Sequence, residues 1–228
     1  MTVVPPVVQS VLNDRLTYLS PKRLTRLHEC AEEIAAKGVF GDILEFGVAL
    51  GGSAVVLARH AKAGRQFHGF DVFGMIPPPQ SPHDDDKSRH RYQIIASGRS
   101  EGIQGDVYYG YRSDLLSDVR STLLRYGMPQ DGKSVFLHRG LFQSTWDQYE
   151  RQSVALAHID CDWYDPVRFC LEAVDRKLSP GGMIIIDDYD DYGGCRKATD
   201  EFLHSRPGKF TVDRDDNLVL RNRSASID

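Results

Sequence analysis

The stretch Asp42–Ser53, DILEFGVALGGS, changes character halfway along, from a short apolar run to a turn rich in glycine. Residues 42–46 are typical of a buried β-strand, and a helical pattern over residues 53–63 follows the glycines. Glycine lets the backbone turn tightly and approach a ligand, and the helix that follows offers free N–H groups. The spacing is G-x-x-x-G-G, not the G-x-G-x-x-G of dinucleotide-binding proteins. The stretch predicts a strand–loop–helix unit, whose glycines serve either a ligand or the turn alone.

The rest of the chain repeats this pattern, because short apolar segments alternate with helical ones. Such alternation is typical of βαβ units and predicts a mostly parallel sheet. Two helices are expected within residues 8–38, and Ser20-Pro21 supplies a start signal for one of them. Further strands are expected at 67–71, 134–138, 154–160 and 183–187, further helices at 113–126, from Asp165-Pro166 to Ser179–Gly182 and at 194–205, and a closing antiparallel hairpin at 209–213 and 217–220.

The length of 228 residues fits one α/β domain, residues 1–228, in which residues 1–40 form the N-terminal helices. In such a domain the ligand binds at the carboxyl ends of the strands. Asp71 ends the second strand, where a carboxylate can accept hydrogen bonds from both hydroxyls of a ribose. Together with the glycine-rich loop, Asp71 predicts a cofactor that carries adenosine.

Three more aspartates follow two strands that are expected to be neighbours. Asp160 ends the strand 154–160, and Asp187-Asp188 follow the apolar run MIII. Like charges at such close range raise one another's pKa, and a hard divalent cation removes the conflict. The three residues therefore predict a Mg²⁺ site. The alternative is a set of helix N-caps and a solvated acidic loop, which describes Asp165, Asp190 and Asp191 better.

These motifs resemble those of class I S-adenosylmethionine methyltransferases and, more narrowly, the macrocin O-methyltransferase (TylF-type) family. Residues 45–53 resemble motif I, which is generic to methyltransferases. HIDCDWY at 158–164 and LSPGGMIIIDDY at 178–189 are more specific, and GCRKATDEF at 194–202 continues the match. The resemblance covers about residues 24–220. It implies a Rossmann-like class I methyltransferase fold and the Mg²⁺-dependent transfer of a methyl group from S-adenosyl-L-methionine to a hydroxyl, typically of a sugar.

The resemblance also implies roles for single residues. Asp160, Asp187 and Asp188 match the family's metal ligands, and Asp162 matches its general base. Gly140 and Phe142 belong to a stretch near the adenine. The residues matched to cofactor binding are Glu45, Gly47, Val48, Ser53, Asp71, Gly140, Phe142 and Asp160.

The segment after the second strand departs from the family pattern. The family commonly carries D-S-F-x-G-L-P here, whereas this chain has DVFGMIP at 71–77. Residues 72–104 are polar and rich in proline, which indicates a lid loop over the site or, equally, disorder before a ligand binds. The run Asp84-Asp85-Asp86 is interpreted as solvated charge and not as a second metal site. The departure leaves the acceptor open.

The composition excludes several classes of protein. With 28 basic and 32 acidic residues the formal charge is −4, which argues against nucleic acid as a partner. No run approaches 18 apolar residues, and the N-terminus lacks the pattern of a signal peptide. The four cysteines form no C-x-x-C pair and are expected to be reduced. We expect a cytoplasmic protein and leave a homodimer open. Its expected partner, as the resemblance implies, is a small sugar or glycoside.

Other functions remain open at this point. A catechol-type O-methyltransferase also holds Mg²⁺ against adjacent hydroxyls, but it usually pairs Asp with Asn after the fifth strand. A non-catalytic protein that binds an adenosyl ligand has no need of the aspartates. A nicotinamide-dependent oxidoreductase requires the missing G-x-G-x-x-G motif. The sequence leaves the roles of His138, His158 and Arg196 undecided between the site and plain packing.

Overall fold

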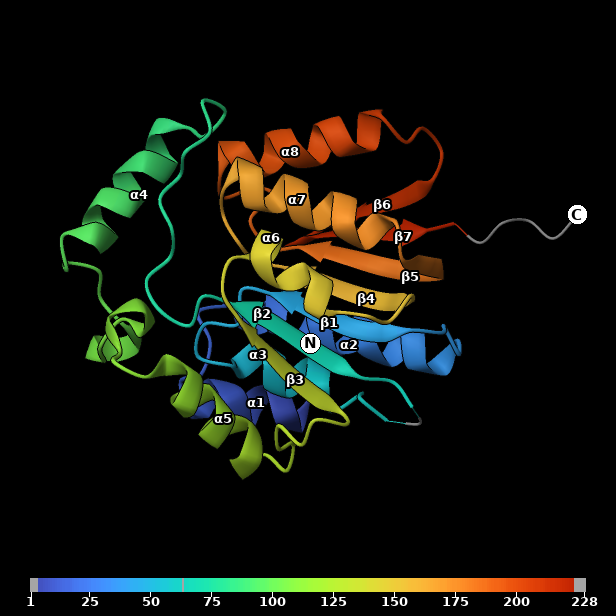
Figure 1. Ribbon diagram of the computed structural model, residues 1–228, viewed down its shortest axis with the longest axis horizontal. Helices are drawn as coiled ribbons and strands as arrows, with labels where there is room; N and C mark the ends of the chain where they lie inside the picture. Colours follow the sequence, from blue (N-terminus) through green and yellow to red (C-terminus); the bar gives the residue numbers. More distant parts are fainter. Residues whose placement is uncertain (1–3, 63, 224–228) are drawn as a thin grey trace, which may run out of the picture.

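The computed structural model describes residues 4–62 and 64–223. Its centre is one seven-stranded sheet in the order β3-β2-β1-β4-β5-β7-β6 (Figure 1). β1 to β5 are parallel, and β6 and β7 add an antiparallel hairpin at one side, which confirms the expected topology. The strands are β1 Asp42–Phe46, β2 Phe67–Asp71, β3 Val135–Arg139, β4 Val154–Ile159, β5 Leu178–Ile186, β6 Phe210–Arg214 and β7 Leu218–Asn222.

Helices cover both faces of the sheet, whereas α4 (Asp86–Ala96) stands away from it (Figure 1). One face carries α1 (Pro6–Asn13), α2 (Pro21–Ala36), α3 (Gly52–Ala58) and α5 (Leu115–Arg125). The other face carries α6 (Phe142–Thr145), α7 (Tyr164–Asp175) and α8 (Gly193–His204). Three single 3₁₀ turns lie at Ile103–Gly105, Tyr109–Tyr111 and Trp146–Gln148. No described helix is both long and apolar enough to cross a membrane.

Strand β1 shows why the sheet needs both layers. Side chains alternate across a strand, so Ile43 packs under the α1–α3 layer and Leu44 packs under α7 and α8. All five residues of β1 are buried, as is typical of a parallel strand covered on both faces. Phe46 stacks on Phe70 of β2 with ring centroids 5.0 Å apart, next to the carboxyl ends of both strands. The apolar runs therefore set the sheet and fix where its carboxyl edge lies.

Among the helix boundaries that differ from the sequence prediction are the end of α3 and the start of α7. α3 ends at Ala58 instead of residue 63, because His60 and Ala61 already fold back in a turn onto Leu57 and Ala58. α7 begins at Tyr164, so Asp165 lies inside the first turn and does not cap the helix. An acidic side chain in the first turn still interacts favourably with the helix dipole.

Strand β5 is longer than predicted. The segment Ser179–Gly182 was expected to end the preceding helix, but it belongs to the strand, which starts at Leu178. Pairing between β4 and β5 shifts register between Val154 and Leu156, and this irregularity accommodates the proline and glycines. Proline and glycine mark a bulge here and not a turn.

Residues 72–104, predicted as a lid loop or a disordered segment, contain the helix α4. Asp85 caps the helix: its Oδ1 accepts hydrogen bonds from Ser88 N at 2.8 Å and from Ser88 Oγ at 2.6 Å. The same carboxylate accepts a 2.7 Å bond from Gly193 N at the start of α8. The aspartate run that was interpreted as solvated charge therefore starts a helix and anchors it to the domain.

Candidate active site

A cavity of about 500 Å³ opens at the carboxyl ends of β1, β2, β4 and β5. Most of the residues predicted from strand ends meet here, although they are far apart in the sequence. Glu45, Val48, Ser53 and Gly140 are set back from the cavity wall. The predicted residues that line it are Gly47, Asp71, Phe142, Asp160, Asp162, Asp187 and Asp188.

The glycine-rich loop is held in place by Asp71. Its Oδ2 accepts hydrogen bonds from Val48 N at 2.7 Å and Ala49 N at 3.0 Å, and its Oδ1 accepts one from Phe73 N at 2.6 Å. Ala49 and Phe73 both have positive φ, at 46° and 49°, so the carboxylate stabilises two strained turns. Burial raises the pKa of Asp71, and these backbone donors lower it.

No residue with a side chain can replace Gly47 in this loop without moving the backbone. Its φ is 93°, and a Cβ there would lie 1.9 Å from the carbonyl oxygen of Asp160. β1 and β4 are adjacent, and Asp160 N donates to Phe46 O at 2.9 Å. Gly47 therefore lets the glycine-rich loop and Asp160 approach each other closely.

Glu45 and His158 form a buried pair below the loop. His158 Nδ1 lies 3.0 Å from Glu45 Oε1, and both side chains are fully buried. Burial raises the pKa of Glu45, while hydrogen bonds from His158 and Ser53 lower it. His158 thus supports the strand ends from inside, and it does not line the cavity. Glu45 and Ser53 are close to each other, but both are set back from the cavity wall.

The three predicted metal ligands converge. Asp160, Asp187 and Asp188 each offer a carboxylate oxygen, and these oxygens lie within 4.8 Å of one another. Burial raises the pKa of Asp160 well above its usual value, and the charges of Asp188 and Asp187 raise it further. Burial likewise raises the pKa of Asp188, with Asp162 and Asp187 adding to the effect. The acidic trio, as we call these three residues, needs a counter-charge.

Part of that counter-charge comes from the N-terminal helices. Arg23, in the first turn of α2, places Nη1 2.8 Å from Asp187 Oδ2 and 2.8 Å from Asp191 Oδ2. Asp187 Oδ1 is buried and accepts no hydrogen bond from any residue that the structure describes. An unpartnered carboxylate oxygen among three acids fits a hard divalent cation, which takes carboxylate ligands. No pattern in the sequence indicates that Arg23 reaches this site, because the contact joins residues 164 positions apart.

Asp162 lies beside the acidic trio in a left-handed conformation, with φ of 58°. Its backbone N–H donates to Asp188 Oδ2 at 3.0 Å, which fixes the turn after Asp160. Burial raises the pKa of Asp162 to about 7, against the opposing charge of Arg91 and with support from Asp187 and Asp191. A carboxyl group with a pKa near neutrality suits proton transfer at physiological pH.

Aromatic residues that the sequence analysis did not select form another wall of the cavity. Tyr18 packs edge-on against Tyr108 and Tyr109, with ring centroids 6.3 Å and 5.8 Å apart. Arg91 of α4 covers the ring of Tyr108, with its guanidinium carbon 5.6 Å from the centroid. The adjacent tyrosines at 108 and 109 were a possible signal, but nothing in the sequence places Tyr18 next to them.

Asp84 is also part of the structure around the cavity. It is buried, and it accepts hydrogen bonds from Tyr164 N at 2.8 Å and Ser81 N at 3.2 Å. Trp163 Nε1 donates to Pro77 O at 2.9 Å, so the segment before α4 is tied to the turn after β4. The interpretation of Asp84 as solvated charge was wrong for this reason, whereas Asp86 is exposed as expected.

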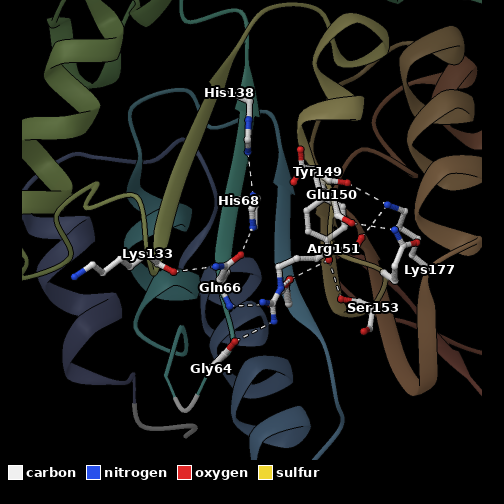
Figure 2. Close-up of polar contacts among 12 residues, drawn as sticks. Gly64, Gln66, His68, Lys133, His138, Tyr149, Glu150, Arg151, Ser153 and Lys177 are labelled. Carbon is white, nitrogen blue, oxygen red and sulfur yellow. Dashed lines mark hydrogen bonds and ion pairs between the residues drawn. The ribbon is translucent and has the colours of Figure 1, made fainter.

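The other two undecided residues have structural contacts away from the cavity. His138 is buried beside His68, and its Nε2 is 3.0 Å from His68 Nδ1 (Figure 2). Its Nδ1 is 3.0 Å from Gln148 Oε1. His68 in turn contacts Gln66. Arg196 donates to Asp190 Oδ1 at 2.9 Å on the surface of α8.

Known proteins are similar to this chain in sequence and in fold. A model of the family described as macrocin-O-methyltransferase (TylF) matches residues 14–218. The 8-demethyl-8-(2,3-dimethoxy-alpha-L-rhamnosyl)-tetracenomycin-C 4'-O-methyltransferase of Streptomyces olivaceus is 31% identical over 201 residues, or 86% of this chain and 69% of that protein. Mycinamicin III 3''-O-methyltransferase of Micromonospora griseorubida is 29% identical over 193 residues, or 82% of this chain and 69% of that protein.

Among solved structures, that of the O-methyltransferase NovP aligns with a TM-score of 0.74 at 23% identity, over 92% of this chain and 83% of that one. At this identity the likeness supports the fold, and the family match rests on the sequence. Because the family model spans the glycine-rich loop and the strand-end aspartates, the chain belongs to the macrocin-O-methyltransferase (TylF) family of S-adenosylmethionine-dependent O-methyltransferases.

Proposed function

We propose that this protein transfers a methyl group from S-adenosylmethionine to a hydroxyl of a sugar or glycoside, with Mg²⁺ held by the acidic trio. The observation that carries the proposal is the convergence of Asp160, Asp187 and Asp188 within 4.8 Å, in the same cavity as Asp162 and the glycine-rich loop. Asp187 and Asp188 are buried and Asp160 is half-buried. Three such carboxylates at one point are costly without a cation, which is why a metal role explains them better than a structural one.

The cofactor fits the end of the cavity formed by Gly47, Ala49, Asp71 and Phe142. Asp71 already accepts three backbone hydrogen bonds. An ionised carboxylate has about four acceptor positions, so Asp71 retains capacity for a ribose hydroxyl. Phe142 offers an apolar surface to an adenine ring. The cofactor supplies the electrophilic methyl group, and this end of the cavity positions it for an in-line displacement.

The acidic trio would hold Mg²⁺, which when bound lowers the pKa of a coordinated acceptor hydroxyl and fixes its position. Arg23 offsets part of the trio's negative charge through Asp187 and keeps that carboxylate in place. Asp162 takes the hydroxyl proton as general base. Its left-handed turn, fixed by the hydrogen bond from its N–H to Asp188, places it next to the metal ligands.

The acceptor is proposed from the cavity wall and from the relatives. The two curated relatives above are named for methylation of sugar positions in glycosylated natural products. Tyr108, Trp163 and Tyr192 line the cavity here, and aromatic rings with polar tips suit a sugar ring, which has apolar faces and a polar edge. Two adjacent hydroxyls of one ring can chelate a single metal ion, so the expected substrate is a vicinal diol.

The segment 72–104 acts as a lid in this proposal. The cavity is lined by three residues of α4, namely Lys87, Arg91 and Ile95. The segment before α4 is anchored by the hydrogen bonds of Asp84, Asp85 and Trp163 described above. In this structure α4 already forms part of the wall. A closed lid excludes water from the reacting groups, which strengthens the electrostatic interactions of the acidic trio.

A panel of glycosides tests the proposal. Purified protein is incubated with labelled S-adenosylmethionine, Mg²⁺ and acceptors that differ only in whether two adjacent hydroxyls are free. We expect label in the vicinal-diol glycosides, little in the matched deoxy or mono-methylated sugars, and none in catechol. Labelling of catechol alone would support the catechol-type activity. If cofactor binds and no acceptor is labelled, the protein is an adenosyl-ligand binding protein.

A further inference from the structure

A second group of metal-ligating side chains lies at the opposite end of the sheet. Gly41, Arg65 and Arg151 come just before β1, β2 and β4, and they line a cavity of about 660 Å³ at the amino ends of these strands. His28 and Glu32 of α2 and His60, which follows α3, line the same cavity. None of these residues takes part in the proposed methyl transfer.

The three side chains are arranged as ligands of one ion. His28 and Glu32 are four residues apart on α2, which places them on the same face of the helix. His60 Nε2 lies 3.5 Å from Glu32 Oε1, and one ligand atom from each of the three residues lies within 4.8 Å of the others. Tetrahedral zinc ligands at about 2.0–2.1 Å from the ion are about 3.4 Å from one another. Glu32 is 61% exposed, so its side chain is free to move the remaining distance.

The two histidines are prepared for a ligand. His28 Nδ1 is buried, and no described residue makes a hydrogen bond to it. His60 is 11% exposed, and its backbone N–H bonds to Leu57 O at 3.0 Å, so a turn fixes its position after α3. Imidazole nitrogens are common ligands of metal ions.

From this arrangement we propose a binding site for Zn²⁺ or a similar transition-metal ion, with His28, Glu32 and His60 as the protein ligands. Two imidazoles and one carboxylate favour such an ion, whereas the all-carboxylate trio at the other end of the sheet favours Mg²⁺. Three ligands leave one position open toward the cavity. Arg59 and Lys62 line that cavity, and their charge favours water, hydroxide or another anion at the open position.

The site has a defined structural consequence. It joins α2, whose first turn carries Arg23, to the end of α3, whose first turn follows the glycine-rich loop. An ion that binds the folded chain better than the unfolded chain stabilises it. Bound Zn²⁺ therefore fixes the two helices that flank the proposed cofactor site, without touching that site.

The test is a Zn²⁺ titration of untagged protein by calorimetry. Excess Mg²⁺ is present to occupy the acidic trio. We expect one Zn²⁺ per chain, at least about tenfold weaker binding in His60→Ala and Glu32→Gln, and no change in Glu29→Gln or His204→Ala. Glu29 and His204 are exposed and lie outside the cluster. Thermal melting provides a second measurement, because Zn²⁺ should raise the Tm of the wild type and not that of His60→Ala.

An Asp188→Asn variant shows whether zinc uses the acidic trio instead. If it binds Zn²⁺ as the wild type does, the ion is at the histidine cluster. The proposal is wrong if Zn²⁺ does not bind in excess Mg²⁺, or if His60→Ala and His28→Ala bind it as tightly as the wild type does. It is also wrong if only Asp188→Asn loses binding.

Discussion

Asp162 has an unusual backbone and a carboxyl group with a pKa raised by burial, and both can be probed with one substitution. Asn tolerates the left-handed conformation almost as well as Asp, so Asp162→Asn should fold normally. It cannot accept the hydroxyl proton, and we expect kcat to fall by about 10²–10⁴-fold. Calorimetry should show S-adenosylmethionine binding close to that of the wild type. The exposed Asp86→Asn serves as the control, and an unchanged kcat in Asp162→Asn would contradict the role of general base.

His68 offers a second residue-level prediction, about stability. Burial, together with the charges of His138 and Arg151, lowers its pKa to about 3. In the unfolded chain the imidazole of His68 gains a proton below about pH 6.5, whereas in the folded chain it stays neutral. The stabilising contribution of the neutral His68 is therefore complete above about pH 6.5 and is lost as the pH falls toward about 3.

Denaturant unfolding at about pH 7 and about pH 5 measures this effect. His68 alone should cost the wild type about 2 kcal/mol of unfolding free energy between the two conditions. His68→Gln has no group that titrates there, so its loss should be smaller by about that amount. Equal losses in the two proteins would mean that His68 is not held neutral in the fold.

At the scale of elements, the loop between β1 and α3 depends on Gly47. Gly47→Ala places a Cβ 1.9 Å from Asp160 O at a φ of 93°, and the backbone cannot absorb both without moving. We expect a loss of more than about 3 kcal/mol in stability, or a folded protein that has lost cofactor binding. Gly127→Ala has φ of 77° but nothing within 4 Å, and it should cost about 1–2 kcal/mol and leave cofactor binding intact. Similar effects of both variants would contradict the close approach.

The cap of α4 makes a separate prediction. Asp85→Ala removes the N-cap and the contact with Gly193, so the proposed lid should open more often. We expect a higher KM for the acceptor and faster proteolysis within residues 77–98, with the S-adenosylmethionine affinity little changed. Asp114→Ala removes the cap of α5 in the same way and should lose about 1 kcal/mol of stability without a change in KM. If both variants have the wild-type KM, α4 does not control acceptor access.

The elements also show which boundaries can be predicted from the sequence. β1 and β2 match their predicted bounds because apolar runs end there in glycine or aspartate at a sheet edge. The start of β5 was missed because Pro180 and the two glycines usually signal a turn, and only pairing with β4 makes them part of a strand. α4 was missed because its 11 residues include few apolar ones, and its stability depends on a cap and on anchors from distant elements.

For the whole molecule, the predicted half of the site comes from one rule, that ligands bind at the carboxyl ends of parallel strands. This rule brought together Asp71, Asp160 and Asp187-Asp188 without any knowledge of contacts. The other half comes from packing between distant segments. Arg23 belongs to α2, Tyr18 lies between α1 and α2, and Tyr108 and Tyr109 lie in the stretch before α5. No local pattern encodes those contacts, so the sequence could not reveal them.

The formal charge of −4 also has a different meaning once the fold is known. Three of the carboxylates lie close together and repel one another, and Arg23 offsets only part of their charge. Bound Mg²⁺ would bring the net charge to about −2 and relieve that repulsion. If the trio holds Mg²⁺ as proposed, the acidic excess is partly a binding site and the remaining charge is nearly balanced, as suits a neutral glycoside.

The most direct measurement is the rate of methyl transfer to a vicinal-diol glycoside in Mg²⁺, in EDTA, and in EDTA followed by excess Mg²⁺. The acidic trio predicts turnover in Mg²⁺, none in EDTA and full recovery when the ion returns, with Asp188→Asn inactive throughout. S-adenosylmethionine binding, followed in the same samples, should survive EDTA. Full turnover by metal-free protein in EDTA would contradict the account.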